Sequence, residues 1–212
     1  MNHRAARSPA ARSYLGARLR EARLRQEIGV RELARRVGVS PAHISQVETG
    51  KADPSATTLF AIASELHLSL NEIAFAESAS SHRAAMLDDR HAESPDGVTQ
   101  HPATRPKIEL GGGVSWERLT PKADPNIDFL YLVYGLGAES TPANALLRHS
   151  GHEYGYVLSG RLQVTIGFKT YELGPGESIG FECTTPHRFA NVGDEPVHAI
   201  WFVSDRHEPA AP

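Results

Sequence analysis

The chain has 212 residues, of which 40% are hydrophobic and 22% charged, an ordinary globular composition that argues against wholesale disorder. This length suits two small domains or one large one. No apolar run approaches the roughly 18 residues of a membrane span, and the N-terminus lacks the apolar stretch of a signal peptide. The single cysteine, Cys183, excludes a disulfide framework. We therefore expect a cytoplasmic protein without a membrane partner.

Charge is distributed unevenly along the chain. Residues 1–75 hold 11 Arg and Lys against 7 Asp and Glu, a balance of +4, whereas residues 76–212 hold 11 against 18, a balance of −7. A basic first third suits a polyanion such as DNA, because neutralised phosphates supply much of DNA affinity. The alternative is that the asymmetry is unrelated to DNA, because many proteins carry their surface charge unevenly.

The N-terminal third predicts a series of short helices. Residues 1–12 are basic and rich in Ala, and we expect them to be mobile. A helix is predicted from Ser13. The next helix has one apolar face at i, i+3, i+4 and i+7, formed by Val30, Leu33, Ala34 and Val37.

A second short helix follows after a glycine turn. Ser40 stands at the N-cap position, Pro41 at the first helical position, and Gly50 where a left-handed C-terminal cap is favoured. Ile44 and Val47 face inward. Two short helices joined by such a turn indicate a helix-turn-helix.

Two more helices complete a predicted five-helix, all-α domain over residues 13–75. Asp53-Pro54 is expected to open the fourth helix, whose apolar positions again fall at i, i+3, i+4 and i+7. Ser69-Leu-Asn-Glu72 reads as the capping box of the fifth. Residues 76–106, with small and polar residues and three prolines, are expected to form a linker.

From Lys107 the apolar period becomes two, which predicts an all-β domain over residues 107–205 and a tail over 206–212. Gly and Pro clusters separate the apolar runs, as expected for a sandwich or barrel of short strands. The predicted strands are Val114–Leu119, Phe129–Tyr134, Tyr154–Leu158, Leu162–Ile166, Ile179–Phe181 and Ala199–Val203.

Residues 13–75 resemble the Xre-type, lambda-repressor-like helix-turn-helix family. The match runs through Leu33-Ala34, Gly38-Val39-Ser40, Ile44-Ser45, Glu48-x-Gly50 and the fourth helix. The resemblance implies that the third helix lies in the major groove of double-stranded DNA, and that Glu48 is structural, with Arg23 as its partner. Relatives often carry Thr-Gln where this chain has Gly29-Val30, and Arg31 is the candidate substitute for the phosphate-contacting Gln.

The third helix provides the candidate DNA-reading residues. With Ile44 and Val47 facing the core, a helical wheel turns Ala42, Ser45, Gln46 and Thr49 outward and places His43 at the margin. Gln46 can bond an adenine edge bidentately, and Ala42 can touch a thymine methyl. Ser45 and Thr49 suit phosphates or base edges. The predicted DNA-binding set is Arg31, Ser40, Ala42, His43, Ser45, Gln46 and Thr49; the alternative is a polar face of a protein-interaction module.

Residues 107–205 resemble the small cupin, or jelly-roll, domain. Gly160 sets the register of the first cupin motif, so that Glu153 and His149 occupy ligand positions while Leu147 replaces the first His. The second motif supplies His187 and Asn191. The resemblance leaves His149, Glu153 and His187 as candidate ligands of a divalent metal such as Fe, Zn, Mn or Ni. The alternative is a metal-free pocket in which these groups bond an organic effector.

Other side chains are candidates for the effector pocket. Because side chains alternate along a strand, half of these candidate side chains must point away from the pocket, but the sequence alone does not fix which half. His152 should point away from Glu153, and Cys183 is expected to be a small buried residue. The set is Tyr131, Tyr134, Tyr154, Tyr156, Arg148 and Trp201, and our effector-binding prediction is Arg148, Tyr154, Tyr156 and Trp201.

Two functions of different classes follow. The first is a homodimeric, nucleoid-associated transcriptional regulator without catalytic residues, whose cupin domain binds a small-molecule effector that modulates operator affinity. The second is a non-haem iron enzyme, because a helix-turn-helix joined to a cupin with His-x3-Glu and a distant His is similar to hydroxypropylphosphonate epoxidase. The intact DNA-reading domain favours the regulator.

Overall fold

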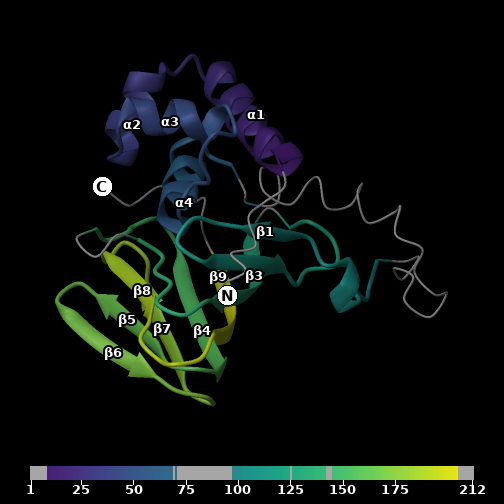
Figure 1. The fold of residues 1–212 in the computed structure, drawn as a ribbon, viewed down its shortest axis with the longest axis vertical. Helices are drawn as coiled ribbons and strands as arrows, with labels where there is room; N and C mark the ends of the chain where they lie inside the picture. Colours follow the sequence, from purple (N-terminus) through teal and green to yellow (C-terminus); the bar gives the residue numbers. More distant parts are fainter. Residues whose placement is uncertain (1–8, 69, 71–96, 125, 142–144, 205–212) are drawn as a thin grey trace.

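The computed structural model describes residues 9–68, 70, 97–124, 126–141 and 145–204. A helical domain lies against one end of a β domain (Figure 1). Within the described residues, no helix is both long and apolar enough to cross a membrane. The helices are α1 (Pro9–Arg25), α2 (Val30–Val37), α3 (Pro41–Glu48), α4 (Ala56–Glu65) and a 3-10 turn at Pro102–Thr104.

Local capping sets the boundaries of the helix-turn-helix. Ser40 accepts a hydrogen bond from the backbone N–H of His43, as the N-cap prediction requires. Gly38 ends α2 with φ of 77°, and Gly50 follows α3 with φ of 68°, so both turns use the left-handed region that glycine adopts without strain. Both helices of the motif therefore lie where the sequence predicts them.

Two helix boundaries differ from the prediction, and one predicted helix lies outside the described residues. Helix α1 begins at Pro9 rather than Ser13. Helix α4 begins at Ala56 rather than at Asp53-Pro54, because the Ser55 hydroxyl caps it by accepting from the N–H of Thr58. The capping box predicted to open a fifth helix at residues 69–72 falls largely on residues that are not described.

The β domain is built from two antiparallel sheets. The larger has the strand order β1-β2-β3-β9-β4-β7 and the smaller the order β6-β5-β8. Buried and exposed positions alternate along β3, β4 and β9, so one face of the larger sheet lies inside the domain. The strands are β1 (Lys107–Glu109), β2 (Val114–Arg118), β3 (Ile127–Tyr134), β4 (His152–Ser159), β5 (Leu162–Ile166), β6 (Lys169–Leu173), β7 (Ser178–Glu182), β8 (His187–Asn191) and β9 (Val197–Ser204).

The six predicted strands are present, and their ends differ from the prediction by at most two residues. The sequence did not separate out β1, β6 and β8. Strand β6 is exposed at four of its five positions, so it carries no apolar run. Strand β8 begins with buried His187 and ends with buried Asn191, because it lines the interior with polar groups.

The two domains share one hydrophobic core. Buried residues of the four helices and of the β domain form a single cluster that joins them through α4. Backbone hydrogen bonds reinforce the contact: the N–H of Gly111 donates to the Pro54 carbonyl at 2.9 Å, and the N–H of Thr57 donates to the Ser140 carbonyl at 3.2 Å. Helix α4 is thus the element through which the helical domain docks on the β domain.

Candidate functional site

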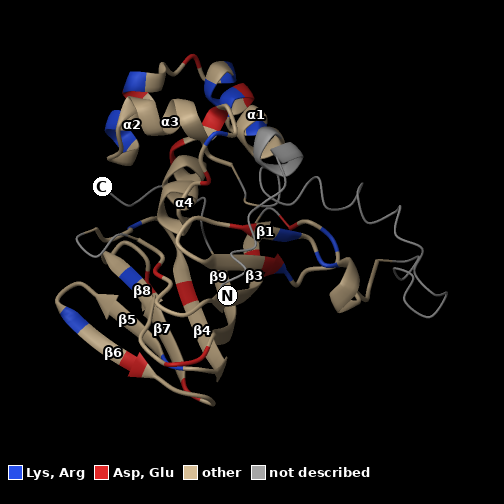
Figure 2. Cartoon of the chain, viewed as in Figure 1, with Lys and Arg blue, Asp and Glu red and all other residues tan. Residues whose placement is uncertain are grey.

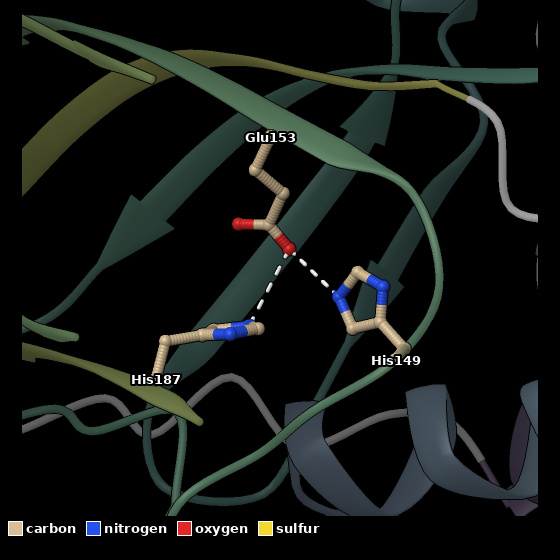
Figure 3. A group of neighbouring side chains, drawn as sticks. All are labelled: His149, Glu153 and His187. Carbon is tan, nitrogen blue, oxygen red and sulfur yellow. Dashed lines mark hydrogen bonds and ion pairs between the residues drawn. The ribbon is translucent and has the colours of Figure 1, made fainter. Parts of the chain in front are cut away.

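Three buried side chains that could ligate a metal meet inside the β domain (Figure 3). His149 lies in the segment that leads into β4, Glu153 is on β4, and His187 is the first residue of β8. One ligand atom from each lies within 4.8 Å of the other two. The structure therefore brings together the three residues that the sequence singled out as metal-ligand candidates.

Backbone carbonyls orient both imidazoles. His149 donates its Nδ1–H to the carbonyl of Ser150 at 2.8 Å, and His187 donates its Nδ1–H to the carbonyl of Thr185 at 2.9 Å. The Nε2 atoms of both rings are thereby left facing Glu153 Oε1, at 2.8 Å from His149 and 3.6 Å from His187. Metal-bound histidines usually have their second nitrogen fixed in this way.

The Nε2 atom of His187 lies too far from Glu153 for a hydrogen bond. It is buried and has no hydrogen-bond partner among the described residues. Buried polar atoms without a partner are rare in folded proteins, and a ligand or ion is one way to satisfy them. The donor set and this nitrogen without a hydrogen bond fit a divalent cation with two imidazole ligands and one carboxylate.

Trp201 holds the Glu153 carboxylate. Its indole Nε1–H donates to Glu153 Oε2 at 2.8 Å, on the opposite side of the carboxylate from His149. The ring reaches this position over Gly155, its neighbour across the β4–β9 pair, where an added Cβ would lie 2.0 Å from Trp201 Cζ3. The glycine in β4 therefore makes room for the ring that orients the carboxylate.

The charges of the cluster depend on one another. Burial raises the pKa of the Glu153 carboxyl, but the two neighbouring imidazoles outweigh burial and hold that pKa well below its usual range. Burial lowers the pKa of His187, yet the Glu153 carboxylate opposes it and the net shift is upward. Burial raises the pKa of the Tyr134 phenol, and the charge of Glu153 adds to that rise.

The cavity beside Glu153 is small and mostly apolar. Its volume is about 20 Å³, and both domains contribute to its walls. Leu147, which occupies the first His position of the cupin motif, is one of the apolar wall residues. Six of the lining side chains are Phe60, Trp116, Tyr134, Leu147, Phe189 and Trp201.

The structure brings only part of the predicted effector set to this cavity. Trp201 and Tyr134 line it, whereas Tyr154 and Tyr156 are about half exposed on the outer face of β4 and Arg148 is exposed. Their positions do not fit a role in the cavity. Cys183 is fully buried and His152 is exposed, in agreement with their predictions.

Sequence reasoning missed Phe60, Trp116 and Phe189 as cavity residues. The one available signal was in α4, where Phe60 is a large apolar residue next to Leu59 and outside the apolar face formed by every third and fourth residue. A helix that is apolar on two sides is usually buried on both. Trp116 was predicted only as a strand residue, and Phe189 lies in β8, which the sequence did not separate out.

The candidate DNA-reading face lies on α3 and the start of α2. Ala42, Ser45, Gln46 and Thr49 are exposed, and His43 is half-buried. The Ser40 hydroxyl caps α3, and the Thr49 hydroxyl donates to the Ser45 carbonyl at 2.7 Å, so both have partners within the motif. Their part in DNA binding stays a prediction.

Positive charge accompanies this face. Figure 2 shows Lys and Arg gathered on α1 and α2. Arg35 and Arg36 are paired with Glu32 on the same helix, whereas exposed Arg31 has no ion pair among the residues that the structure describes. Its role as a phosphate contact stays a prediction.

A buried ion pair fixes α3 in the domain. Arg23 of α1 donates from Nε to Glu48 Oε1 at 2.6 Å and from Nη2 to Glu48 Oε2 at 2.9 Å. Its Nη1 donates to the carbonyl of Ile28 at 2.7 Å. The predicted partnership of Arg23 and Glu48 is confirmed.

Comparisons with known proteins identify both domains. A helix-turn-helix family matches residues 19–73, and the cupin-domain family matches residues 133–203. The HTH-type transcriptional regulator PuuR of Escherichia coli is 30% identical over 178 residues, which cover 84% of this chain and 87% of that protein. These matches confirm both resemblances seen in the sequence.

A solved structure shares the two-domain fold. An HTH_3 family transcriptional regulator from Vibrio cholerae aligns with 93% of this chain and 98% of its own, with a TM-score of 0.64 and 23% identity. Hydroxypropylphosphonic acid epoxidase from S. wedmorenis aligns with 93% of this chain and 100% of its own, at 22% identity and a TM-score of 0.42.

Proposed function

Because the chain belongs to the family of helix-turn-helix transcriptional regulators with a C-terminal cupin domain, we propose that it binds operator DNA through α3 and that ligand binding in its cupin domain changes operator affinity. The observation that carries the proposal is the combination of an exposed polar face on α3 with a buried, oriented His-Glu-His cluster in the domain on which the helices dock.

Gln46 is the residue that tests the DNA-reading role. It is exposed on α3, and a glutamine side chain can form two hydrogen bonds to an adenine edge. We expect Gln46→Ala to relax selectivity at one base position by about 1–3 kcal/mol while leaving the domain folded. The measurement is selection of bound sequences from random DNA, followed by titration of the selected site.

Gln163→Ala, a change in β5 of the cupin domain, is the matched control and should leave the selected sequence unaltered. An unchanged base preference in Gln46→Ala would show that α3 does not read DNA in this orientation.

We propose a homodimer, because helix-turn-helix readers bind two spaced half-sites. The outer face of the larger sheet supplies an apolar surface for a second copy: Tyr154, Tyr156 and Leu158 are 52%, 46% and 45% exposed along β4. Replacement of both tyrosines by serine should shift the sedimentation equilibrium toward monomer. Phe168→Ser, at a fully exposed turn between β5 and β6, is the control that removes an aromatic ring elsewhere.

We propose that His149, Glu153 and His187 hold a divalent cation. Such an ion would supply open coordination positions for a small ligand. His187→Ala should abolish stoichiometric zinc binding measured by calorimetry, whereas His198→Ala, on β9, should leave it intact. Stoichiometric iron in the purified protein together with a lack of DNA binding would overturn the regulator in favour of the oxygenase alternative.

A further inference from the structure

The DNA-reading domain supplies one wall of the cupin cavity. Phe60 of α4 is 6% exposed, and its ring stacks on the imidazole of His149 with centroids 5.1 Å apart and planes 5° from parallel. The same ring lies tilted against Trp116 of β2 at 4.9 Å. A side chain of the helical domain thus contacts a member of the His-Glu-His cluster directly.

With Phe60 in this position the cavity is too small for an organic ligand. Its volume is about 20 Å³. A water molecule requires about 10–15 Å³ on this measure, whereas pockets for small organic ligands measure roughly 300–1,000 Å³. One water or a metal ion fits, and anything larger must displace a wall.

The wall formed by Phe60 belongs to the docking contact. Four residues before Phe60, α4 begins at Ala56, which also lines the cavity. Next to it, Thr57 donates from both its N–H and its Oγ1 to the carbonyl of Ser140, at 3.2 and 2.6 Å. Ser140 is in turn bonded to Phe189 of β8, two residues beyond His187.

We propose that the cupin cavity is a composite site gated by Phe60, in which occupancy by an organic ligand and docking of α4 on the β domain exclude each other. The ligand class is a small molecule whose polar end binds the His-Glu-His cluster and whose flat or apolar part takes the place of the Phe60 ring. The inference rests on the proposed ligand role of the cupin domain but does not require that a metal is present.

Exclusion of this kind links the two domains energetically. A ligand that binds only when α4 is released from the β domain shifts the equilibrium toward the released state. Any contact that holds α4 in place lowers the affinity for the ligand by the same factor. Phe60 is the residue that couples ligand binding in the cavity to the docking of α4.

A larger side chain placed in the cavity tests the exclusion without an added ligand or metal. Leu147→Phe adds a ring to the cavity from the cupin side, while Leu136→Phe adds the same ring at an exposed position just after β3. The readouts are the amide exchange rates of Thr57 and Gly111, whose N–H groups bond across the interface. We expect Leu147→Phe to speed both by about tenfold or more and Leu136→Phe to leave them unchanged.

Size complementation separates exclusion from general damage. Phe60→Ala alone should also speed exchange at Thr57 and Gly111, because it removes the ring that packs between the domains. The double variant Phe60→Ala/Leu147→Phe restores the missing ring from the other side, so its exchange should be slower than in either single variant. Additive acceleration in the double variant, or unchanged exchange in Leu147→Phe, overturns the proposal.

Access to the cluster gives an independent reading. Diethyl pyrocarbonate acylates accessible imidazole nitrogens, and His149 should react about tenfold faster in metal-free Phe60→Ala than in the wild type, because the Phe60 ring no longer covers its imidazole. Exposed His67 serves as the internal standard. Equal rates for His149 in both proteins would show that Phe60 is not the gate.

The outcomes keep the two proposals apart. If zinc fails to protect His149 in Phe60→Ala, the metal proposal fails while the gate stands. If Gln46→Ala leaves DNA recognition unaltered but Leu147→Phe releases α4, the gate again stands and the DNA-reading assignment fails.

Discussion

Loss of the Glu48 carboxylate should destabilise the DNA-reading domain strongly. The two side chains of the Arg23–Glu48 pair are each 6% exposed, and the pair joins α1 to the last residue of α3 by two hydrogen bonds. Removal of one partner of a buried pair leaves the other charge without compensation, which costs about 3–5 kcal/mol. We place Glu48→Ala near the lower bound, at about 3 kcal/mol, because Arg23 keeps its bond to the Ile28 carbonyl.

Two further variants separate charge from shape. Glu48→Gln retains one acceptor for the guanidinium, so we expect a loss of about 2 kcal/mol. The double variant Arg23→Met/Glu48→Leu replaces the pair by apolar groups, and we expect it to lose much less than the sum of the single changes.

Native-state exchange at Ile44 is the appropriate assay. The N–H of Ile44 bonds to the Ser40 carbonyl at 3.2 Å inside α3, so its exchange reports the opening of the helix that Glu48 anchors. An exchange-derived loss below about 1 kcal/mol for Glu48→Ala would match an exposed surface pair and refute the reasoning from burial.

Three further predictions concern the two sites. Trp201→Phe should weaken zinc binding by about 10–100-fold in a chelator competition, because it removes the donor that orients Glu153; a change below about threefold contradicts that positioning role. Ser40→Ala should cost about 1 kcal/mol in thermal unfolding of the helical domain, because the hydroxyl cap of α3 is lost. Glycine is itself tolerated at an N-cap, so Ser40→Gly should cost only a few tenths of a kcal/mol. Arg31→Ala should weaken binding to all DNA sequences alike and reduce the salt slope by about 1, whereas Arg35→Ala, whose guanidinium is paired with Glu32, should change the slope less.

The helix-turn-helix was predictable because local interactions determine it. The apolar spacing of α2, the cap at Ser40 and the left-handed glycines are properties of short segments, and the structure places each as expected. The Arg23–Glu48 pair was also reached from the sequence, but through the family resemblance, since nothing local joins residues 25 positions apart.

The β domain was only partly predictable. Strands with an apolar face were found, whereas β6 and β8 were not, because one is mostly exposed and the other lines the interior with polar groups. Strand alternation required half of the candidate pocket residues to face outward, but which face of β4 lies inside depends on its pairing with β9 and β7. Tyr154 and Tyr156 consequently lie on the outer face.

The sequence by itself determined two domains of known type through apolar period and motif spacing, and the resemblance to the cupin motif singled out the three residues of the His-Glu-His cluster. Only the tertiary structure decided that Trp201 orients Glu153 and that Phe60 of the helical domain closes the cavity. Both contacts join segments distant in the chain, and their geometry depends on how α4 and the two sheets pack. The sequence of α4 shows the spacing of its apolar residues, but not which surface covers the second apolar side of the helix.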